Sequence, residues 1–322
     1  MDIDVVLPWV DGNDPAHAKK RAEFSGHYKA EDPAIGASEV SGNIRWQCAE
    51  EIRYALRSIE RNLSFVRRVW IITDGQAPPL QDLSPDFQRR VVVVDHRDAF
   101  GKHCDLLPCF NSAAIETPAA LLEDVADHVI LSNDDVFFTQ PSQPDDFFLP
   151  DGRVKLRGTF DGGFMDYATM WGWHTRNGAR LAGIPQDQML TPAHCAQPID
   201  MRMVREFLKR NPLLLRSNLS YRFRDQAQFT LSSLATHLSI LAGRATLLDQ
   251  QDWYHIPAGK MRTVPMGRLR KRLNIALLER HRLVCLNDLA GLLERMPDAR
   301  GLLDDHFGID RDADGAATRK VA

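Results

Sequence analysis

Three short, almost continuously apolar segments in the first half of the chain each end in a turn with acidic residues. The segments are 3–10, 66–73 and 128–131, and the turns contain Asp11 with Asp14, Asp74, and Asp134 with Asp135. Strands this uniformly apolar are typical of a parallel sheet that is buried on both faces. In such sheets, ligands bind beyond the carboxyl ends of the strands. The pattern therefore predicts an α/β fold whose functional site lies where the acidic turns converge.

Helical segments alternate with the strand-like ones, which favours a mostly parallel sheet covered on both sides. Further strands are predicted over 90–95 and 281–286, and helices over 50–62, 115–125, 200–210, 224–242, 266–279 and 289–296. We expect one domain over residues 1–309, with an inserted helical portion over about 158–280 packed on the α/β core. Residues 310–322 are polar and are predicted to be a disordered tail.

The charge balance and the apolar runs exclude several classes of protein. The chain has 322 residues, with 40 Lys and Arg against 43 Asp and Glu. This near balance argues against nucleic-acid binding, which needs a basic face. No apolar run approaches the roughly 18 residues of a membrane span, and the N-terminus lacks the pattern of a secretory signal. We expect no transmembrane segment and a cytoplasmic location, and leave open attachment to the inner membrane face through partners.

The cysteines do not form a recognisable framework. Their number is odd, and no two have C-x-x-C spacing, which argues against a zinc ribbon. We interpret them as inert thiols in a reducing compartment. They are Cys48, Cys104, Cys109, Cys195 and Cys285.

Two polar turns suit a hard divalent cation. Asp134 and Asp135 follow an apolar strand beside Asn133, and adjacent carboxylates offer the oxygen ligands that Mg²⁺ prefers. Asn287 and Asp288 follow the last predicted strand. They join the same metal only if the fold brings the two turns together; otherwise they cap the helix that follows.

Three further groups suit phosphate or proton chemistry. His194 lies in the proline-bounded loop TPAHCAQP, where a neutral imidazole could accept a proton from a hydroxyl nucleophile. Arg222 and Arg224 flank an aromatic residue, and guanidinium groups bind phosphate well, although alternating charge on a solvated face explains the same pattern. Asn111 and Ser112 are typical helix caps.

Several nucleotide-binding motifs are absent from the sequence. Neither G-x-G-x-x-G nor G-x-x-x-x-G-K followed by Ser or Thr occurs, and G-x-S-x-G is missing as well. Their absence argues against a dinucleotide dehydrogenase, a Walker-type ATPase and an α/β-hydrolase.

Six sequence blocks follow one another along the chain: IDVVLPWVDGNDP (3–15), EIRYALRSIE (51–60), IITDGQAP (71–78), LPCFNSAAIE (107–116), LSNDDVFF (131–138) and CLND (285–288). In this order they resemble the Stealth family of sugar-1-phosphate transferases, which act in microbial capsule and exopolysaccharide synthesis and are related to animal N-acetylglucosamine-1-phosphotransferase. The resemblance implies transfer of a hexose-1-phosphate, with N-acetylhexosamine the expected sugar, from a UDP-sugar such as UDP-GlcNAc. The acceptor would be a hydroxyl of a polysaccharide or glycan, and UMP would leave as a phosphodiester forms.

The resemblance also implies a core similar to the GT-A glycosyltransferases and a divalent metal, Mg²⁺ or Mn²⁺. Two alternatives stay open: a GT-A-type glycosyltransferase that releases UDP, and a catalytically silent protein that binds glycans or nucleotide-sugars. Association with a polysaccharide synthesis complex is also left open.

The resemblance assigns roles to individual residues. It implies that the metal is held by Asp134, Asp135, Asn287 and Asp288. His194 is the expected general base with Asp11 or Asp14 as second choice, and the transferred phosphoryl group would contact Arg222 and Arg224. Substrate contacts are predicted for Trp9, Arg53, Arg57, Asn111, Ser112, Glu116 and Asn133.

Overall fold

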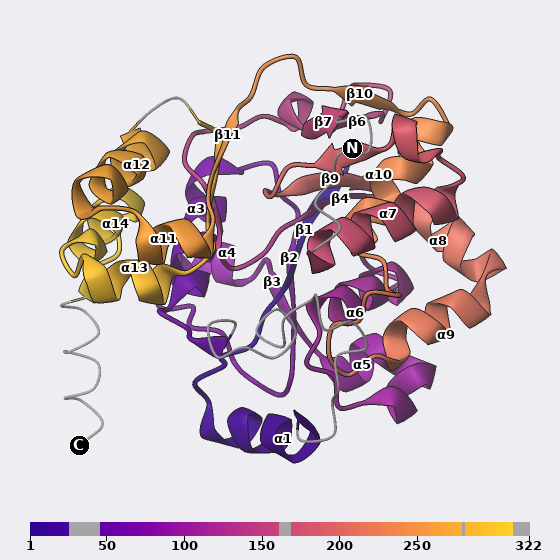
Figure 1. The fold of residues 1–322 in the computed structure, drawn as a ribbon, viewed down its shortest axis with the longest axis horizontal. Coiled ribbons are helices and arrows are strands. Elements are labelled where there is room, and N and C mark those ends of the chain that lie inside the picture. The colour runs from indigo at the N-terminus through magenta and orange to yellow at the C-terminus, as the bar shows by residue number, and fades with distance from the viewer. Residues whose placement is uncertain (26–45, 161–168, 279–280, 312–322) are drawn as a thin grey trace.

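A five-stranded sheet forms the centre of the molecule (Figure 1), and the computed structural model describes residues 1–25, 46–160, 169–278 and 281–311. Its strands are β1 (Ile3–Pro8), β2 (Val69–Thr73), β3 (Val91–Asp95), β4 (His128–Leu131) and β9 (Gln197–Asp200). They lie in the order β3-β2-β1-β4-β9, and only β9 runs antiparallel to its neighbour. The prediction of an α/β fold with a mostly parallel sheet is confirmed.

Both faces of the inner strands β2, β1 and β4 are buried, which explains why these strands are apolar at nearly every position. Val5 and Leu7 of β1 pack with Ile71 of β2 in one core cluster. Val6 and Ile72 point the opposite way and belong to a second core cluster. Successive side chains of a strand alternate between its faces, so a strand between two cores needs apolar residues on both.

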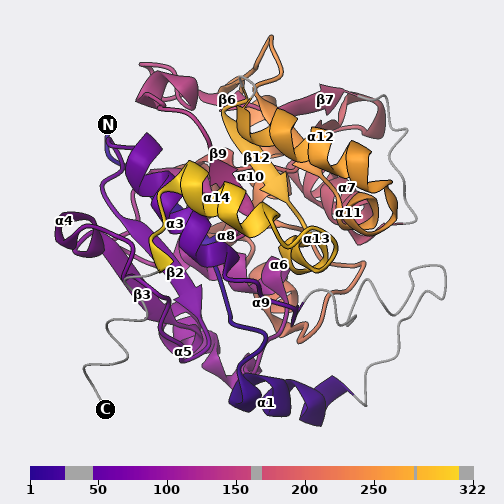
Figure 2. The same ribbon diagram turned by 90° about the vertical axis from the view of Figure 1, so that its left-hand side faces the viewer.

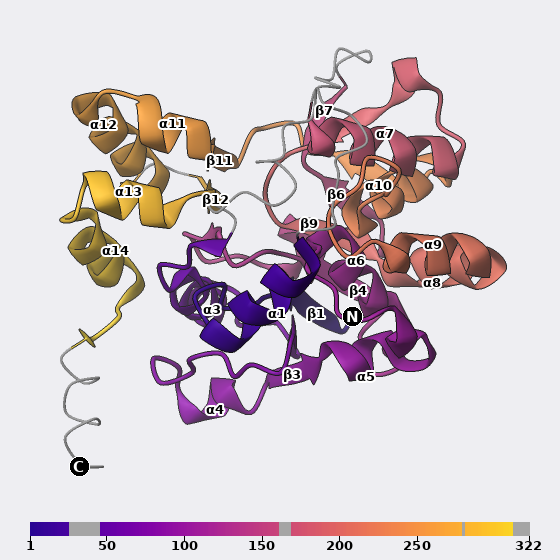
Figure 3. The ribbon, with the colours of Figure 1, turned by 60° about the horizontal axis from the view of Figure 1, so that its bottom comes forward.

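The first face is covered by α3 (Glu51–Asn62) together with the C-terminal part of the chain. Figure 3 shows the C-terminal helices gathered on one side of the molecule; they are α11 (Ala258–Thr263), α12 (Met266–Leu278), α13 (Leu289–Arg295) and α14 (Ala299–Phe307). The Tyr54 hydroxyl donates a 2.7 Å hydrogen bond to Asp304 and so ties α3 to α14.

The second face carries most of the other helices. They are α5 (His96–Phe100), η2 (Gly101–Leu106), α6 (Ser112–Glu116), η3 (Thr117–Leu121), α7 (Met170–Ala182), α8 (Met201–Arg210), α9 (Pro212–Ser220) and α10 (Leu231–Leu241). Figure 1 shows α7 to α10 on the side opposite the C-terminal helices. In the part of the chain that the structure describes, no helix has both the length and the apolar character to cross a bilayer.

A second sheet, of three strands, lies beside the first. It consists of β11 (Trp253–Ile256), β12 (Leu283–Leu286) and β5 (Val136–Phe138), in that order. Two further pairs of strands occur among the described residues: β6 (Val154–Leu156) with β10 (Ala245–Leu247), and β7 (Gly158–Phe160) with β8 (Leu190–Pro192). The remaining short elements are α1 (Pro15–Ser25), α4 (Pro85–Gln88), η4 (Pro144–Asp146) and η5 (Gln186–Gln188).

The segment 158–280, expected to be helical, therefore also supplies strands. One of them, β9 (Figure 2), is an edge strand of the central sheet, and β11 belongs to the second sheet. The predicted tail is described only as far as residue 311, and residues 312–322 lie outside the described part of the chain.

Two predicted helices have the wrong length. The helix expected over 115–125 is α6, which ends at Glu116 and passes into the 3₁₀ turn η3. Pro118 lies at the start of that turn, and proline cannot donate the backbone hydrogen bond that would continue an α-helix.

The helix expected over 224–242 begins only at Leu231, where the Thr230 hydroxyl accepts a hydrogen bond from the backbone N–H of Ser233. Residues 224–230 form a loop instead. Contacts with α6 hold this loop in place. The apolar periodicity of the segment itself carries no information about such long-range contacts.

Candidate active site

The turns that follow β1 and β4 meet at the carboxyl edge of the central sheet. These strands are parallel neighbours, with Val6 beside Leu131, so the chain leaves both at the same edge. From β1 the chain goes outward to β2 and β3, and it returns on the other side of β1 to form β4. The strand order therefore reverses between β1 and β4. An open α/β sheet usually binds its ligand in the crevice at such a point.

The second sheet brings the last polar turn to the same place. Strand β5 follows the turn of Asp134 and Asp135, and it pairs antiparallel with β12 so that Val136 lies opposite Cys285. The backbone N–H of Leu286 donates to the Asp135 carbonyl at 2.9 Å. Strand pairing therefore places the predicted motif CLND beside the acidic pair.

Asn287 is the centre of a side-chain network at this edge. Its Nδ2 donates to Asp135 Oδ2 at 2.7 Å and lies 3.1 Å from His194 Nε2, while its Oδ1 contacts His255 Nε2. An amide oxygen only accepts and an amide nitrogen only donates. His255 is accordingly protonated on Nε2, and His194 accepts on Nε2 and carries its proton on Nδ1.

His255 also belongs to this network, although it lies in none of the motifs recognised in the sequence. It lies on β11 opposite Cys285 of β12, and its ring stacks on His194 at a centroid distance of 4.7 Å and an angle of 11°. Burial lowers the pKa of His255, which keeps its imidazole neutral near pH 7. The position of a histidine beside CLND in a neighbouring strand could not be found without the strand pairing.

The acidic turn has the properties expected of a cation site. Burial, and then repulsion by Asp135 and Glu51, raises the pKa of Asp134 well above its usual value. Burial also raises the pKa of Glu51 to about 7. Asp135 Oδ1 is buried and has no hydrogen-bond partner among the described residues. A divalent cation would relieve this repulsion and occupy that oxygen, so Asp134 and Asp135 fit Mg²⁺ or Mn²⁺.

The carboxylate of Asp288 is already occupied by hydrogen bonds and is not available to bind a metal ion. Arg262 donates to both of its oxygens, at 2.6 and 3.2 Å, and the backbone N–H of Gly291 donates at 2.9 Å. The residue is the N-cap of α13, the alternative that the sequence left open for it. Asn287 likewise acts on Asp135 through its amide nitrogen, which cannot ligate a metal.

Asn111 and Glu116 hold the loop that carries Arg222 and Arg224. The Asn111 amide donates to the carbonyls of Tyr221 and Phe223 and to the Gln228 side chain, at 2.7–3.0 Å. Arg224 donates to the Ser112 hydroxyl at 2.6 Å. Glu116 accepts a 2.5 Å hydrogen bond from the backbone N–H of Leu231, and burial raises its pKa to about 8.

The other predicted residues are arranged as follows. Arg222 lies over the Phe24 ring at 4.7 Å, and Asn133 is exposed in the acidic turn. Trp9 is 8% exposed at the end of β1. Asp11 and Asp14 accept hydrogen bonds from the backbone N–H groups of Asn13 and His17.

Arg53 and Arg57 are not brought into the Asn287 network. Arg53 is buried and forms a two-point ion pair with Asp82, at 2.6 and 2.8 Å. Arg57 pairs with Glu60 and donates to the Phe307 carbonyl. Both therefore fasten α3 to its surroundings.

Two conserved regions of the Stealth proteins match this chain. Conserved region 1 matches residues 1–29, and conserved region 2 matches residues 45–156. The resemblance predicted from the sequence is confirmed over these regions, and the second contains the acidic pair. His194 and Asn287 lie beyond both regions, and the roles assigned to individual residues, inside the regions or outside them, stay predictions.

Curated relatives match about half of this chain. The chain is 40% identical to an exopolysaccharide phosphotransferase of Streptomyces coelicolor over 154 residues. This aligned stretch covers 48% of this chain and 24% of the relative. The chain is 31% identical to the capsular polysaccharide phosphotransferase WcwK of Streptococcus pneumoniae over 153 residues. This aligned stretch covers 48% of this chain and 43% of WcwK. The match thus spans less than half of each relative.

Two solved glycosyltransferases are similar in outline. Mouse xyloside xylosyltransferase 1 in its apo form has a TM-score of 0.41 and 13% identity, covering 89% of this chain and 98% of that one. The galactosyltransferase LgtC in complex with donor and acceptor sugar analogues has a TM-score of 0.44 and 11% identity. The alignment covers 97% of this chain and 99% of LgtC. Likeness at this level carries no information on the reaction of this chain.

Proposed function

We propose that this chain, which carries conserved regions 1 and 2 of the Stealth proteins, transfers a sugar-1-phosphate from a nucleotide-sugar to a hydroxyl of a glycan acceptor. The donor we propose is a UDP-N-acetylhexosamine, bound at the crevice between β1 and β4 as in a GT-A-like core, and the products are a phosphodiester and UMP. One observation carries the proposal: Asn287 joins the carboxylate of Asp135 to the imidazole of His194. The cluster thus combines cation ligands with a general base.

Asp134 and Asp135 would hold the divalent cation, Mg²⁺ or Mn²⁺. When bound, such a cation neutralises charge on the diphosphate and so assists departure of the nucleotide. Asn287 occupies Asp135 Oδ2 through a hydrogen bond and leaves Oδ1 without a partner among the described residues. The carboxylate is therefore oriented before any ligand binds, which lowers the cost of organising the site.

His194 is the residue that we propose to accept the proton of the acceptor hydroxyl. Its Nε2 is unprotonated, since it faces the Nδ2 donor of Asn287 at 3.1 Å. An acceptor hydroxyl can replace this hydrogen bond and pass its proton to the same nitrogen. The imidazolium that forms would be stabilised by the Asp135 carboxylate, which is bonded to the same Asn287 amide.

Arg222 and Arg224 are proposed to stabilise the transferred phosphoryl group. The hydrogen bonds of Asn111 and Ser112 fasten the loop that carries them to α6, and this support would limit the movement of the arginines when substrate binds. Positive charge aimed at the equatorial oxygens favours the transition state, in which those oxygens carry the charge. Asn111 and Ser112 thus act on the substrate through the arginines.

The released nucleotide identifies the reaction. The full chain is incubated with UDP-N-acetylglucosamine and Mg²⁺ or Mn²⁺, with and without a polysaccharide acceptor. We expect release of UMP that requires the metal and is lost in Asp135→Asn. Asp145→Asn, which changes an exposed carboxylate, is the matched control and should behave like the wild type. Release of UDP would identify a glycosyltransferase and overturn the proposal, and no release from any nucleotide-sugar would favour a silent binding protein.

A further inference from the structure

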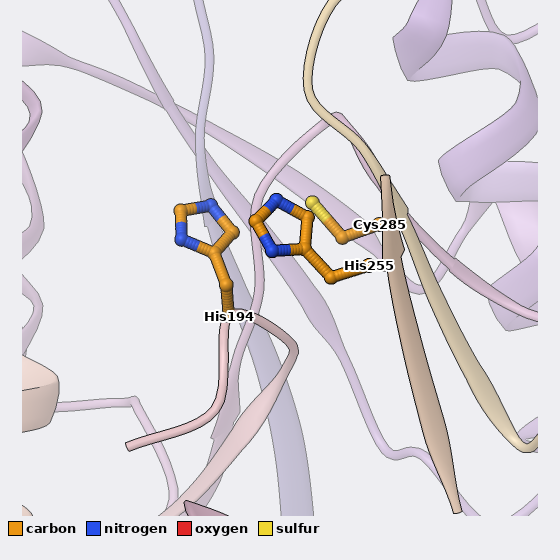
Figure 4. A group of neighbouring side chains, drawn as sticks. All are labelled: His194, His255 and Cys285. Carbon is orange, nitrogen blue, oxygen red and sulfur yellow. The ribbon is translucent and has the colours of Figure 1, made fainter. Parts of the chain in front are cut away.

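Two imidazoles and a thiol gather beside Asp135, and the proposed transfer gives a role to His194 but none to His255 or Cys285. His255 and Cys285 are opposite each other on the parallel strands β11 and β12, and His194 comes from the loop between β8 and β9. One potential ligand atom from each of the three residues lies within 4.8 Å of the others. Figure 4 shows the His255 ring between the His194 ring and the Cys285 sulfur.

The chemistry of these atoms points to a different kind of metal from the acidic pair. Two imidazole nitrogens and a thiolate sulfur are ligands of Zn²⁺, whereas Mg²⁺ takes oxygen ligands. Around a tetrahedral zinc ion, with bonds of about 2.0–2.3 Å, the ligand atoms lie about 3.3–3.8 Å apart. To reach that geometry, the ligand atoms must approach one another by up to about 1 Å, and one of the two stacked imidazole rings must rotate so that both nitrogen lone pairs point at the ion.

Asp135 offers the fourth ligand. Asp135 precedes Val136, which lies opposite Cys285 in the β5–β12 pair, and the Asp135 carbonyl accepts a 2.9 Å hydrogen bond from the N–H of Leu286, so Asp135 and Cys285 come from neighbouring positions of paired strands. Asp135 Oδ1 is buried and has no hydrogen-bond partner among the described residues. The Asn287 amide joins Asp135 to both imidazoles, so it holds these three side chains together and must turn aside for an ion to enter.

We propose that His194, His255 and Cys285, with Asp135 Oδ1 as fourth ligand, form a Zn²⁺ site whose occupation stops the transferase. On binding, the Cys285 thiol releases its proton to solvent as the zinc–sulfur bond forms, and the neutral imidazoles and the carboxylate each donate a lone pair. Zinc would thereby take the His194 nitrogen and the Asp135 oxygen away from catalysis. The inhibition rests on the proposed function, but the binding of zinc does not.

Cobalt spectroscopy tests the binding without any measurement of activity. The metal-free full chain is titrated with Co²⁺, and we expect one ion per chain, a thiolate-to-cobalt charge-transfer band, and loss of that band when Zn²⁺ is added. Losing an outer partner of a metal ligand already costs about 10–100-fold in affinity. Loss of a direct ligand in Cys285→Ser should therefore remove the band and weaken zinc binding by more than about 100-fold.

Two further variants make this test specific. His255→Gln should weaken zinc binding to a similar extent but keep the thiolate band, and it serves as the second test if Cys285→Ser does not fold. Cys104→Ser removes an exposed thiol outside the group and should bind both ions like the wild type. Absence of the band in the wild type, or its persistence in a folded Cys285→Ser chain, would overturn the zinc site.

The inhibition is measured as UMP release in saturating Mg²⁺ with and without buffered Zn²⁺. We expect zinc to abolish release by the wild type and a chelator to restore it, whereas Cys285→Ser should need about 100-fold more zinc for the same fractional loss of its own activity. Bound zinc with unchanged UMP release would overturn the inhibition. If no nucleotide is released with or without zinc, the proposed function fails and the cobalt titration still decides the zinc site.

Discussion

Asn287 donates a 2.7 Å hydrogen bond to Asp135, although 152 positions separate the two residues in the chain. The contact exists because β5 and β12 pair antiparallel, which sets the end of one strand beside the start of the other. The same amide reaches His194 and His255. One side chain therefore connects segments of the chain that were predicted separately to have metal and proton roles.

Replacing Asn287 should disable the site without unfolding the protein. In Asn287→Ala, Asp135 loses a donor and His194 loses the partner that sets its tautomer, and we expect UMP release to fall by about 10²-fold, the lower end of the effect of losing a positioned base. Asn274→Ala, at an exposed position of α12, is the control and should keep wild-type kcat. Equal rates for the two variants would show that the amide is dispensable.

His194 and His255 should differ in the size of their effects. His194→Ala removes the proposed base and should lower kcat by about 10²–10⁴-fold, whereas His306→Ala on α14 should not. His255→Phe keeps a ring but loses one neutral hydrogen bond of about 0.5–1.5 kcal/mol, so a two- to tenfold loss of kcat is expected with little change in donor KM. Steady-state kinetics separate these cases, and a normal turnover in His194→Ala would remove the residue from its role.

Arg53→Ala should affect stability more than substrate binding. It would leave the buried Asp82 carboxylate without its partner, a change that typically costs about 3–5 kcal/mol. Arg89→Ala breaks an exposed ion pair with Asp86 and should cost less than about 1 kcal/mol. Urea unfolding gives both values. A stable Arg53→Ala chain that no longer binds the donor would instead support the substrate contact predicted from the sequence.

Glu116 should make the protein less stable as the pH rises. Its pKa is about 8 in the folded chain against a usual 4.5, so the folded state binds more protons between these values. Stability is then lost from about pH 4.5 to pH 8, with a slope of up to about 1.4 kcal/mol per pH unit. Glu116→Gln keeps an acceptor for the Leu231 N–H but cannot ionise.

The Glu116→Gln chain should accordingly gain stability over the wild type as the pH rises through this range. Denaturant unfolding at pH 5 and pH 8 measures the difference. Glu123→Gln, which changes an exposed carboxyl, is the control and should show the pH dependence of the wild type. A constant difference between Glu116→Gln and wild type at the two pH values would contradict a protonated Glu116.

Much of the fold could be predicted because its signals are local. The strands from β1 to β4 and the helix α3 follow from apolar patterns within about ten residues, and the acidic turns lie where those strands end. The errors occurred where a distant contact or a single residue overrode the pattern. Pro118 ends α6 early, and Asn111 and Glu116 hold residues 224–230 as a loop in place of a helix turn.

By itself the sequence determined the α/β class, the acidic pair Asp134–Asp135 and the resemblance to the Stealth proteins, since each depends on residues close together in the chain. Which polar residues meet depends on how the strands and helices pack. In the folded chain Asp288 forms an ion pair with Arg262, Arg53 forms an ion pair with Asp82, and the His255 ring stacks on His194. These neighbours are set by strand order and register, which depend on burial across the whole chain. The apolar periodicity within one segment therefore does not reveal them.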